Sequence, residues 1–172
     1  HVANTCEDLT ISGNTLRRAG APGPLIRLTP HSGGVCGGVA ITGNTLSQGT
    51  PAWAIYAESL SRAVINGNKI AHTVYAPGFS AIYDKSVVAS APVNALSIAG
   101  NVITGEVTYA ITLDASIGGY GPGVSVSGNV ATGTVFGLRC STGSGFAAPV
   151  LVDGNTIGPG VWPGVTVTAG VQ

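Results

Sequence analysis

Charged side chains are scarce in this chain, at 8% of its 172 residues, against about 25% in an ordinary globular domain. Seven basic residues balance seven acidic ones, so the formal net charge is zero. Nucleic acid is therefore not expected as a partner, because phosphate recognition needs a concentrated positive field. No apolar run approaches the ~20 residues of a membrane-spanning helix, so insertion into a membrane is not expected either.

Methionine is absent, even at position 1. This absence predicts that the chain is a fragment of a longer product, and no secretory signal peptide is visible in it. The length fits a single domain, residues 1–172,.

Residues that bind metals or cofactors are few and scattered. The three cysteines form no C-x-x-C pair, so a zinc site is not predicted. His1, His31 and His72 lie far apart, and we expect them to be solvated in loops or at the terminus. No phosphate-binding loop, nucleophile elbow or nucleotide fingerprint is present. We therefore expect neither a metal nor an organic cofactor.

What the chain does contain is an eight-residue pattern that recurs six times. The pattern is h-x-h-x-Gly-Asn-x-h, where h is apolar, and its first copy runs from Leu9 to Leu16. The intervals between successive copies average about 28 residues,. The asparagines of the six copies are Asn14, Asn44, Asn68, Asn101, Asn129 and Asn155.

Each copy reads as a short strand followed by a bend. Leu9 and Ile11 alternate with polar residues, so they share one strand face,. Gly13 supplies backbone freedom, and Asn14 tolerates a left-handed conformation and offers an amide for turn hydrogen bonds,. One unit cannot bury its apolar face alone, but stacked units about 4.8 Å apart can. The expected fold is all-β: a single-stranded, right-handed parallel β-helix of about six coils with an internal asparagine ladder.

A second alternating strand follows each asparagine by roughly ten residues, after Gly- and Pro-rich stretches of variable length,. Loops of different length on a fixed strand frame explain the uneven period. These strands are expected at residues 25–29, 54–58, 81–85, 110–114, 137–141 and 164–168.

The repeat resembles that of the pectin-lyase-like right-handed β-helices, which include pectate lyases, polygalacturonases, alginate epimerases and bacteriophage tailspikes. The resemblance covers nearly the whole chain. It implies the fold, but it rests on structural residues and so implies little about activity. In character the chain is most similar to tailspike and tail-fibre domains, which implies a virion or extracellular location and a homotrimer.

The outward column of the second strands carries the first candidate site. It consists of Arg27, Tyr56, Tyr83, Thr112, Arg139 and Thr166. Two tyrosines on adjacent coils, flanked by arginines, could stack on sugar rings and bind hydroxyls or carboxylates. Arg27, Tyr56, Tyr83 and Arg139 are therefore the predicted carbohydrate-binding residues. The alternative is a solvent-facing sheet of β-favouring side chains.

Two residues further along, Glu58 and Asp114 flank Lys85. One interpretation is an ion ladder between stacked strands. The other is a catalytic carboxylate pair roughly 9–10 Å apart, near the upper end of the inverting-glycosidase range. Asp84 stands beside them at an inward position, where burial is costly without hydrogen bonds. Glu58, Asp84 and Asp114 are thus candidate catalytic residues, although neither the polygalacturonase nor the pectate lyase motif surrounds them.

The cysteines suggest one covalent link. Cys6 and Cys36 each lie three residues before the repeat strand, and adjacent coils suit disulfide geometry. A disulfide between them is one prediction, and two stacked thiols are the alternative. Cys140 is expected in the core.

The shortage of charge also predicts partners. Trp53, Phe79, Phe146 and Trp162 lie in loops and turns, and the ends of a β-helix expose unpaired strands,. We therefore expect homo-oligomerisation, with a trimer favoured by the resemblance, or continuation into flanking domains.

Three functions follow, in this order. The first is a carbohydrate-binding and structural module of a virion tailspike or fibre, or another extracellular protein, which contacts cell-surface polysaccharide. The second is a polysaccharide-degrading enzyme, either a lyase or an inverting glycoside hydrolase. The third, an ice- or surface-binding solenoid, ranks last because the threonine columns are irregular.

Overall fold

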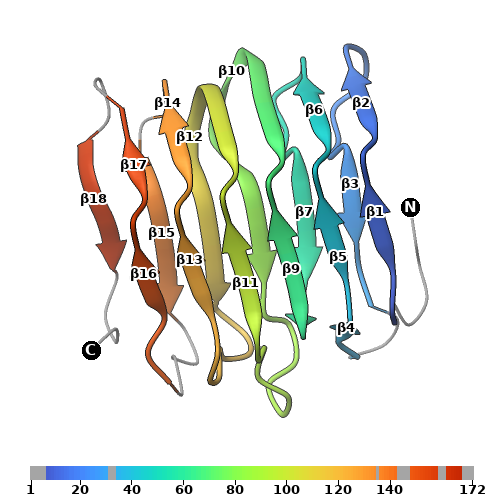
Figure 1. The fold of residues 1–172 in the computed structure, drawn as a ribbon, viewed down its shortest axis with the longest axis vertical. Coiled ribbons are helices and arrows are strands. Elements are labelled where there is room, and N and C mark those ends of the chain that lie inside the picture. The colour runs from blue at the N-terminus through green and yellow to red at the C-terminus, as the bar shows by residue number, and fades with distance from the viewer. Residues whose placement is uncertain (1–6, 31–33, 135, 143–147, 159–161, 168–172) are drawn as a thin grey trace.

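The computed structural model describes residues 7–30, 34–134, 136–142, 148–158 and 162–167. Across these residues the chain is all-β and contains no helix. Its strands stack in parallel as a solenoid of about five turns, which Figure 1 shows from the side. The predicted fold class is therefore confirmed.

One wall of the solenoid is a six-stranded parallel sheet made from the first half of each repeat. Its interior column runs through equivalent isoleucines, because Ile11 pairs with Ile41, Ile41 with Ile65, and Ile65 with Ile98. In spatial order the strands are β1 (Thr10–Ser12), β5 (Ala40–Thr42), β9 (Ala63–Asn66), β11 (Leu96–Ala99), β13 (Ser125–Ser127) and β16 (Leu151–Asp153).

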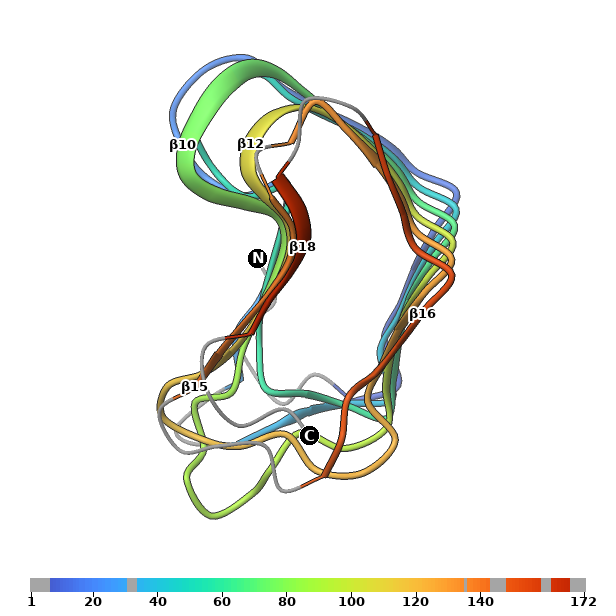
Figure 2. The same cartoon turned by 90° about the vertical axis from the view of Figure 1, so that its left-hand side faces the viewer.

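A second sheet begins after each asparagine. Strands β10 (Lys69–Lys85) and β12 (Val102–Ala115) are long and bend, so each contributes to both halves of this sheet. Figure 2 shows the bend as a lobe at one corner of the cross-section. The half next to the asparagines also contains β2 (Thr15–Arg18), β6 (Thr45–Gln48), β14 (Val130–Thr132) and β17 (Thr156–Ile157).

The other half of the second sheet, here called the far wall, contains the strands that were expected ten residues after each asparagine. It consists of β3 (Ile26–Leu28), β7 (Ile55–Glu58), the second parts of β10 and β12, β15 (Phe136–Thr142) and β18 (Trp162–Val167). A separate two-stranded sheet joins β4 (Cys36–Gly37) to β8 (Leu60–Ser61).

The corner between the two sheets depends on the glycine of each Gly-Asn pair. All six of these glycines have positive φ, between 60° and 66°. Among the described residues, the non-glycine residues with positive φ are Asp8, Ser59, Arg62 and Ala95, so no described asparagine adopts the left-handed conformation. The asparagine tolerates this conformation, but the preceding glycine is the residue of the pair that adopts it. The glycine makes the bend, because it lacks a Cβ, and this leaves the asparagine free to act through its amide.

The asparagine ladder is present. The backbone N–H and the Nδ2 of Asn44 both donate to Oδ1 of Asn68, at 3.0 and 2.9 Å. Its Nδ2 also donates to the Ile11 carbonyl, at 2.9 Å. The same pattern links Asn68 to Asn101 and continues to Asn155. The ladder thus satisfies amides that are fully buried from Asn44 to Asn101,.

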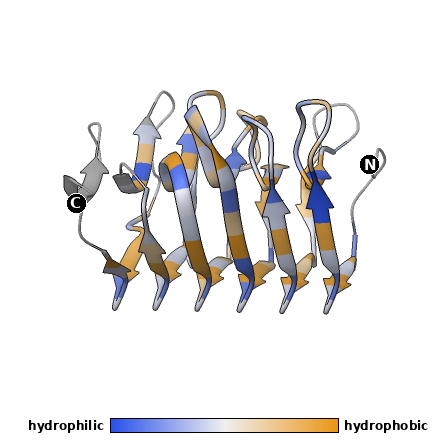
Figure 3. Ribbon diagram, turned by 90° about the horizontal axis from the view of Figure 1, so that it is seen from above, coloured by the Kyte–Doolittle hydropathy of each residue, from blue (hydrophilic) through white to orange (hydrophobic). Residues whose placement is uncertain are grey.

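Apolar side chains fill the interior between the sheets. Ile41, Leu46, Ile65 and Ile70 are all at most 1% exposed. In Figure 3 the apolar segments, in orange, recur at equivalent places on successive coils. Burial of this repeated column offsets the entropy of ordering the chain, because each coil covers the apolar face of the next.

The cysteine predictions have separate outcomes. Cys140 is 1% exposed, as expected of a core residue. Cys36 is also buried, but Cys6 lies outside the described residues. The Cys6–Cys36 disulfide therefore stays a prediction.

The expectation of a solvated His72 is wrong. His72 lies within β10, pairs with Gln48 and Gly105, and is 5% exposed. Among the described residues, neither of its ring nitrogens has a hydrogen-bond partner. Burial accordingly lowers its pKa to about 4,. His72 is the last residue of β10 that pairs with both neighbouring coils before the register shifts. His1 and His31 lie outside the described residues.

A candidate carbohydrate-binding face

The far wall brings the predicted outward column into register. Arg27 pairs with Tyr56, Tyr56 with Tyr83, Tyr83 with Thr112, and Thr112 with Arg139. Thr166 follows Arg139 in the backbone pairing. The column is thus continuous from β3 to β18.

Thr112 adds little accessible surface to this column. It is only 1% exposed, and its Oγ1 lies 2.7 Å from Oγ of Ser80. The accessible part of the column is therefore Arg27, Tyr56, Tyr83 and Arg139, of which Arg27 is exposed and the others are half-buried.

Four aromatic rings gather on the far wall, two of them within this column. The rings of Tyr56 and Tyr83 stack, with centroids 5.5 Å apart and an angle of 12° between their planes. Trp53 contacts both tyrosines, at centroid distances of 4.9 and 5.6 Å. Phe79 meets Trp53 edge-on at 4.8 Å. We call Trp53, Tyr56, Phe79 and Tyr83 the aromatic face.

Sequence reasoning found the tyrosines of this face but not Trp53 and Phe79, which it assigned only to exposed loops. A signal for both was present. Trp53 precedes Tyr56 by three residues and Phe79 precedes Tyr83 by four. Trp53 and Phe79 therefore lie two and three residues before the paired residues Ile55 and Ile82 of adjacent coils.

The tyrosine hydroxyls are held by carboxylates. Tyr56 donates a hydrogen bond to Oε1 of Glu58 at 2.6 Å, and Tyr83 donates to Oδ2 of Asp114 at 2.5 Å. Burial and these hydrogen bonds raise the pKa of both tyrosines,. Both rings are therefore neutral and held in one orientation.

Arginines lie at both ends of the accessible column. The guanidinium carbon of Arg27 is 5.6 Å from the Tyr56 ring centroid, and that of Arg139 is 5.1 Å from the Tyr109 ring centroid. Both distances allow cation–π attraction. Arg27, Tyr56, Trp53 and Pro24 together line a surface hollow of about 200 Å³.

The carboxylate candidates divide between the two faces of the far wall. Glu58 and Asp114 both pair with Lys85, so they lie outward and two coils apart, about 9.6 Å by strand spacing. Among the described residues, no ion pair joins Lys85 to either carboxylate, so the predicted ion ladder does not form there. The tyrosine hydroxyls bind the carboxylates instead.

Asp84 points into the core, as its position predicted, and is separated from Glu58 and Asp114. It is 0% exposed, and it accepts hydrogen bonds from the Tyr120 hydroxyl at 2.9 Å and from the Leu60 N–H at 3.3 Å. Burial raises its pKa to about 7, although both hydrogen bonds act in the opposite direction,. The structure therefore does not bring the three candidate catalytic carboxylates onto one surface.

The ionisation of Asp114 is also unlike that of a general acid. Burial would raise its pKa, but hydrogen bonds from Tyr83 and Ser116 outweigh burial and hold the pKa below its ordinary value,. A general acid near neutral pH needs the opposite shift.

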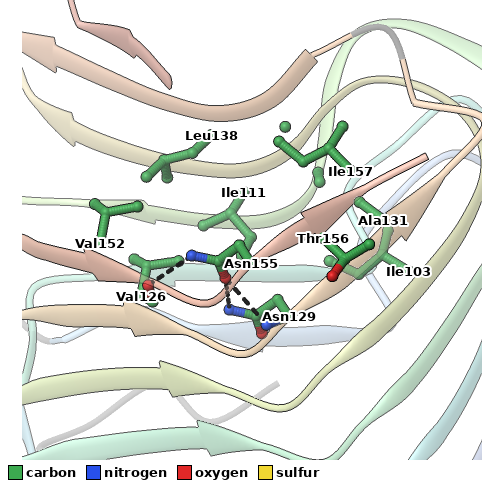
Figure 4. A pocket seen from close by; sticks show the side chains of 12 residues that line it. Ile103, Ile111, Val126, Asn129, Ala131, Leu138, Val152, Asn155, Thr156 and Ile157 are labelled. Carbon is green, nitrogen blue, oxygen red and sulfur yellow. Dashed lines mark hydrogen bonds between the residues drawn. The ribbon is translucent and has the colours of Figure 1, made fainter. Parts of the chain in front are cut away.

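The solenoid also contains an internal hollow near its C-terminal end (Figure 4). This cavity has a volume of about 40 Å³, and its apolar lining includes Ile111, Leu138 and Ile157. Asn129 and Asn155 border it, but their amides belong to the ladder. The cavity is therefore a packing feature of the core.

No family model, curated protein or solved structure matches this chain. The structure itself is that of a parallel β-solenoid, and this is the class to which the fold assigns the chain. Within the described part of the chain, no helix has the length and apolarity to cross a membrane. No cluster of three or more His, Cys, Asp or Glu residues suited to a metal was found in that part either.

Proposed function

We propose that this solenoid is a carbohydrate-binding and structural module that contacts cell-surface polysaccharide with its far wall. By the resemblance of its repeat, it belongs to a virion tailspike or fibre, or to another extracellular surface protein of the pectin-lyase-like group. Its partners are the polysaccharide and either further copies of the chain, favouring a trimer, or flanking domains.

The aromatic face is the observation that carries the proposal. Sugar rings present C–H surfaces that pack on aromatic faces, while their hydroxyls need polar partners at the ring edge. The stacked rings of Tyr56 and Tyr83 form one aromatic surface with the tilted ring of Trp53, and Glu58 and Asp114 lie at the tyrosine hydroxyls. Because hydrogen bonds and the packing of Trp53 already fix both rings, little side-chain entropy would be lost on binding.

Carbohydrate binding can be tested on a glycan microarray, followed by titration of the best ligand while Trp53 fluorescence is recorded. Tyr56→Ala should weaken binding about tenfold, because it removes a stacking surface and its contact with Trp53. Tyr75→Ala is the matched control, since Tyr75 lies on the bend of β10 and is 57% exposed. It should leave binding unchanged.

Two outcomes would contradict the proposal. One is a microarray without signal for protein whose far-ultraviolet spectrum is that of a folded β-protein. The other is an equal loss of binding in Tyr56→Ala and Tyr75→Ala, which would place the ligand elsewhere.

A further inference from the structure

The charges on the far wall alternate in sign from one coil to the next. The strand register places Glu58, Lys85 and Asp114 at the same position on β7, β10 and β12. Arg27 on β3 and Arg139 on β15 continue the order at the two ends, each two residues earlier along its strand. From β3 to β15 the order is therefore positive, negative, positive, negative, positive.

The two carboxylates of this pattern are bound by neutral groups rather than by the cations. Among the described residues no ion pair joins them, and each carboxylate is instead bound by a neutral donor. Glu58 accepts the Tyr56 hydroxyl, and Asp114 accepts the Tyr83 hydroxyl and the Ser116 N–H. The cationic groups of Arg27, Lys85 and Arg139 are therefore not bound by a carboxylate, although Arg27 and Arg139 lie against the rings of Tyr56 and Tyr109.

The spacing of like charges on the far wall is close to the length of two sugars in an extended polysaccharide. Like charges recur on every second coil, about 9.6 Å apart along the solenoid axis. An extended chain of β-linked pyranoses advances by nearly one coil spacing per sugar. A chain lying along the axis would therefore meet Lys85 between two carboxylates and, two coils away on either side, Arg27 and Arg139, which are displaced by two residues along their strands.

We propose that the far wall binds a linear acidic polysaccharide that carries one carboxylate on every second sugar. This inference rests on the proposed function and adds the class of ligand. The acidic sugars lie opposite Arg27, Lys85 and Arg139. The neutral sugars between them lie opposite Glu58 and Asp114, whose free lone pairs accept sugar hydroxyls.

The same pattern discriminates against two other kinds of chain. A polymer with a carboxylate on every sugar would place negative charge opposite Glu58 and Asp114, and like charges in contact oppose binding. A neutral polymer would keep the stacking on Tyr56 and Tyr83 but would lose the attraction to the cations.

Calorimetric titration of the full chain with three oligosaccharides of equal length tests this inference. The probes are a hyaluronan oligosaccharide, in which glucuronate alternates with N-acetylglucosamine, an oligogalacturonate and a cello-oligosaccharide. The hyaluronan probe should bind most tightly, and its affinity should fall as salt is added. The double variant Glu58→Gln/Asp114→Asn should bind oligogalacturonate more tightly than the parent chain does.

Lys85→Gln should weaken hyaluronan binding about threefold to fivefold, as expected for loss of one exposed ion pair. It should weaken cello-oligosaccharide binding by a smaller factor than hyaluronan binding. Lys69→Gln is the matched control, because Lys69 is an exposed lysine at the other end of the same strand, β10. It should leave both affinities unchanged.

The outcomes separate this inference from the proposed function. Equal binding of the three probes, a preference for oligogalacturonate, or no response to Lys85→Gln would overturn the inferred charge pattern while carbohydrate binding stands. Absence of binding to all three probes together with a microarray without signal would overturn both.

Discussion

Asp84 and His72 are ionisable side chains enclosed by the solenoid, and their pKa values move in opposite directions. Asp84 has a pKa of about 7, above the ordinary value, so its contribution to stability is full below pH 4 and is lost as the pH rises to 7,. His72 has a pKa of about 4, below the ordinary value, so its contribution is full above pH 6.5 and is lost as the pH falls to 4,. The two effects oppose each other over the same range.

Asp84→Asn should reveal that the opposite pH dependences of Asp84 and His72 cancel in the parent chain. Each effect is worth roughly 3–4 kcal/mol, at 1.36 kcal/mol per pKa unit, so the parent chain should show a flat stability profile between about pH 4 and 6.5. The variant keeps a polar group beside Tyr120 but cannot ionise. Its free energy of unfolding should therefore rise with pH across this range, as only His72 still titrates.

Urea unfolding at pH 4, 5, 6 and 7 measures this difference. His72→Gln serves as the opposite control, since its stability should fall as the pH rises. Parallel profiles for the parent chain and Asp84→Asn would show that Asp84 does not titrate in the folded core.

At the scale of elements, the asparagine ladder joins strands that are far apart in sequence. Each interior amide accepts two hydrogen bonds from the coil on one side and donates to the coils on both sides. Removal of one interior amide therefore affects both neighbours, whereas removal of the terminal Asn14 affects only one.

Asn68→Ala should lower the free energy of unfolding by on the order of 3–5 kcal/mol, because it removes four buried hydrogen bonds and leaves the Asn44 N–H without its side-chain acceptor,. The Asn44 Nδ2, the Ile41 carbonyl and Oδ1 of Asn101 each lose one bond as well. The Asn44 Nδ2 keeps its bond to the Ile11 carbonyl, and Oδ1 of Asn101 keeps the backbone N–H of residue 68. Asn14→Ala is the control at the exposed end and should cost about 1 kcal/mol. Equal losses in chemical denaturation would contradict a cooperative ladder.

At the scale of the whole molecule, the surface carries few charges. Leu151 is 63% exposed and Val64 is 39% exposed on the outer face of the six-stranded sheet. Among the described residues at the N-terminal end, β1, β2 and β3 each have a strand neighbour on one side only. Such surfaces favour association, because charge is the usual means of keeping copies apart.

Sedimentation equilibrium tests the expected homotrimer. The chain has a mass of 17.0 kDa, so a trimer should give three times this value at micromolar concentration, independent of salt. A single species with the monomer mass at all concentrations would contradict the prediction of a homo-oligomer, and a dimer would contradict the trimer.

The sequence alone determined the repeating unit of this protein and the faces of its strands. Six Gly-Asn pairs at equivalent repeat positions predicted the ladder. The alternation of side chains along each strand, with a period of two, predicted the column from Arg27 to Arg139. The inward position of Asp84 followed from the same alternation.

Only the tertiary structure decided which side chains contact one another between the strands and turns. Trp53 contacts both tyrosines, Phe79 contacts Trp53, and His72 is buried where β10 pairs with both neighbouring coils. These contacts depend on how successive coils pack against each other. Arg62 and Ala95 both have positive φ, and each precedes one residue of the Ala63–Leu96 pair. Their shared backbone geometry was not visible in the sequence, because their side chains have no chemistry in common. Local pattern sets which face a residue occupies, whereas packing between coils sets which residues meet there.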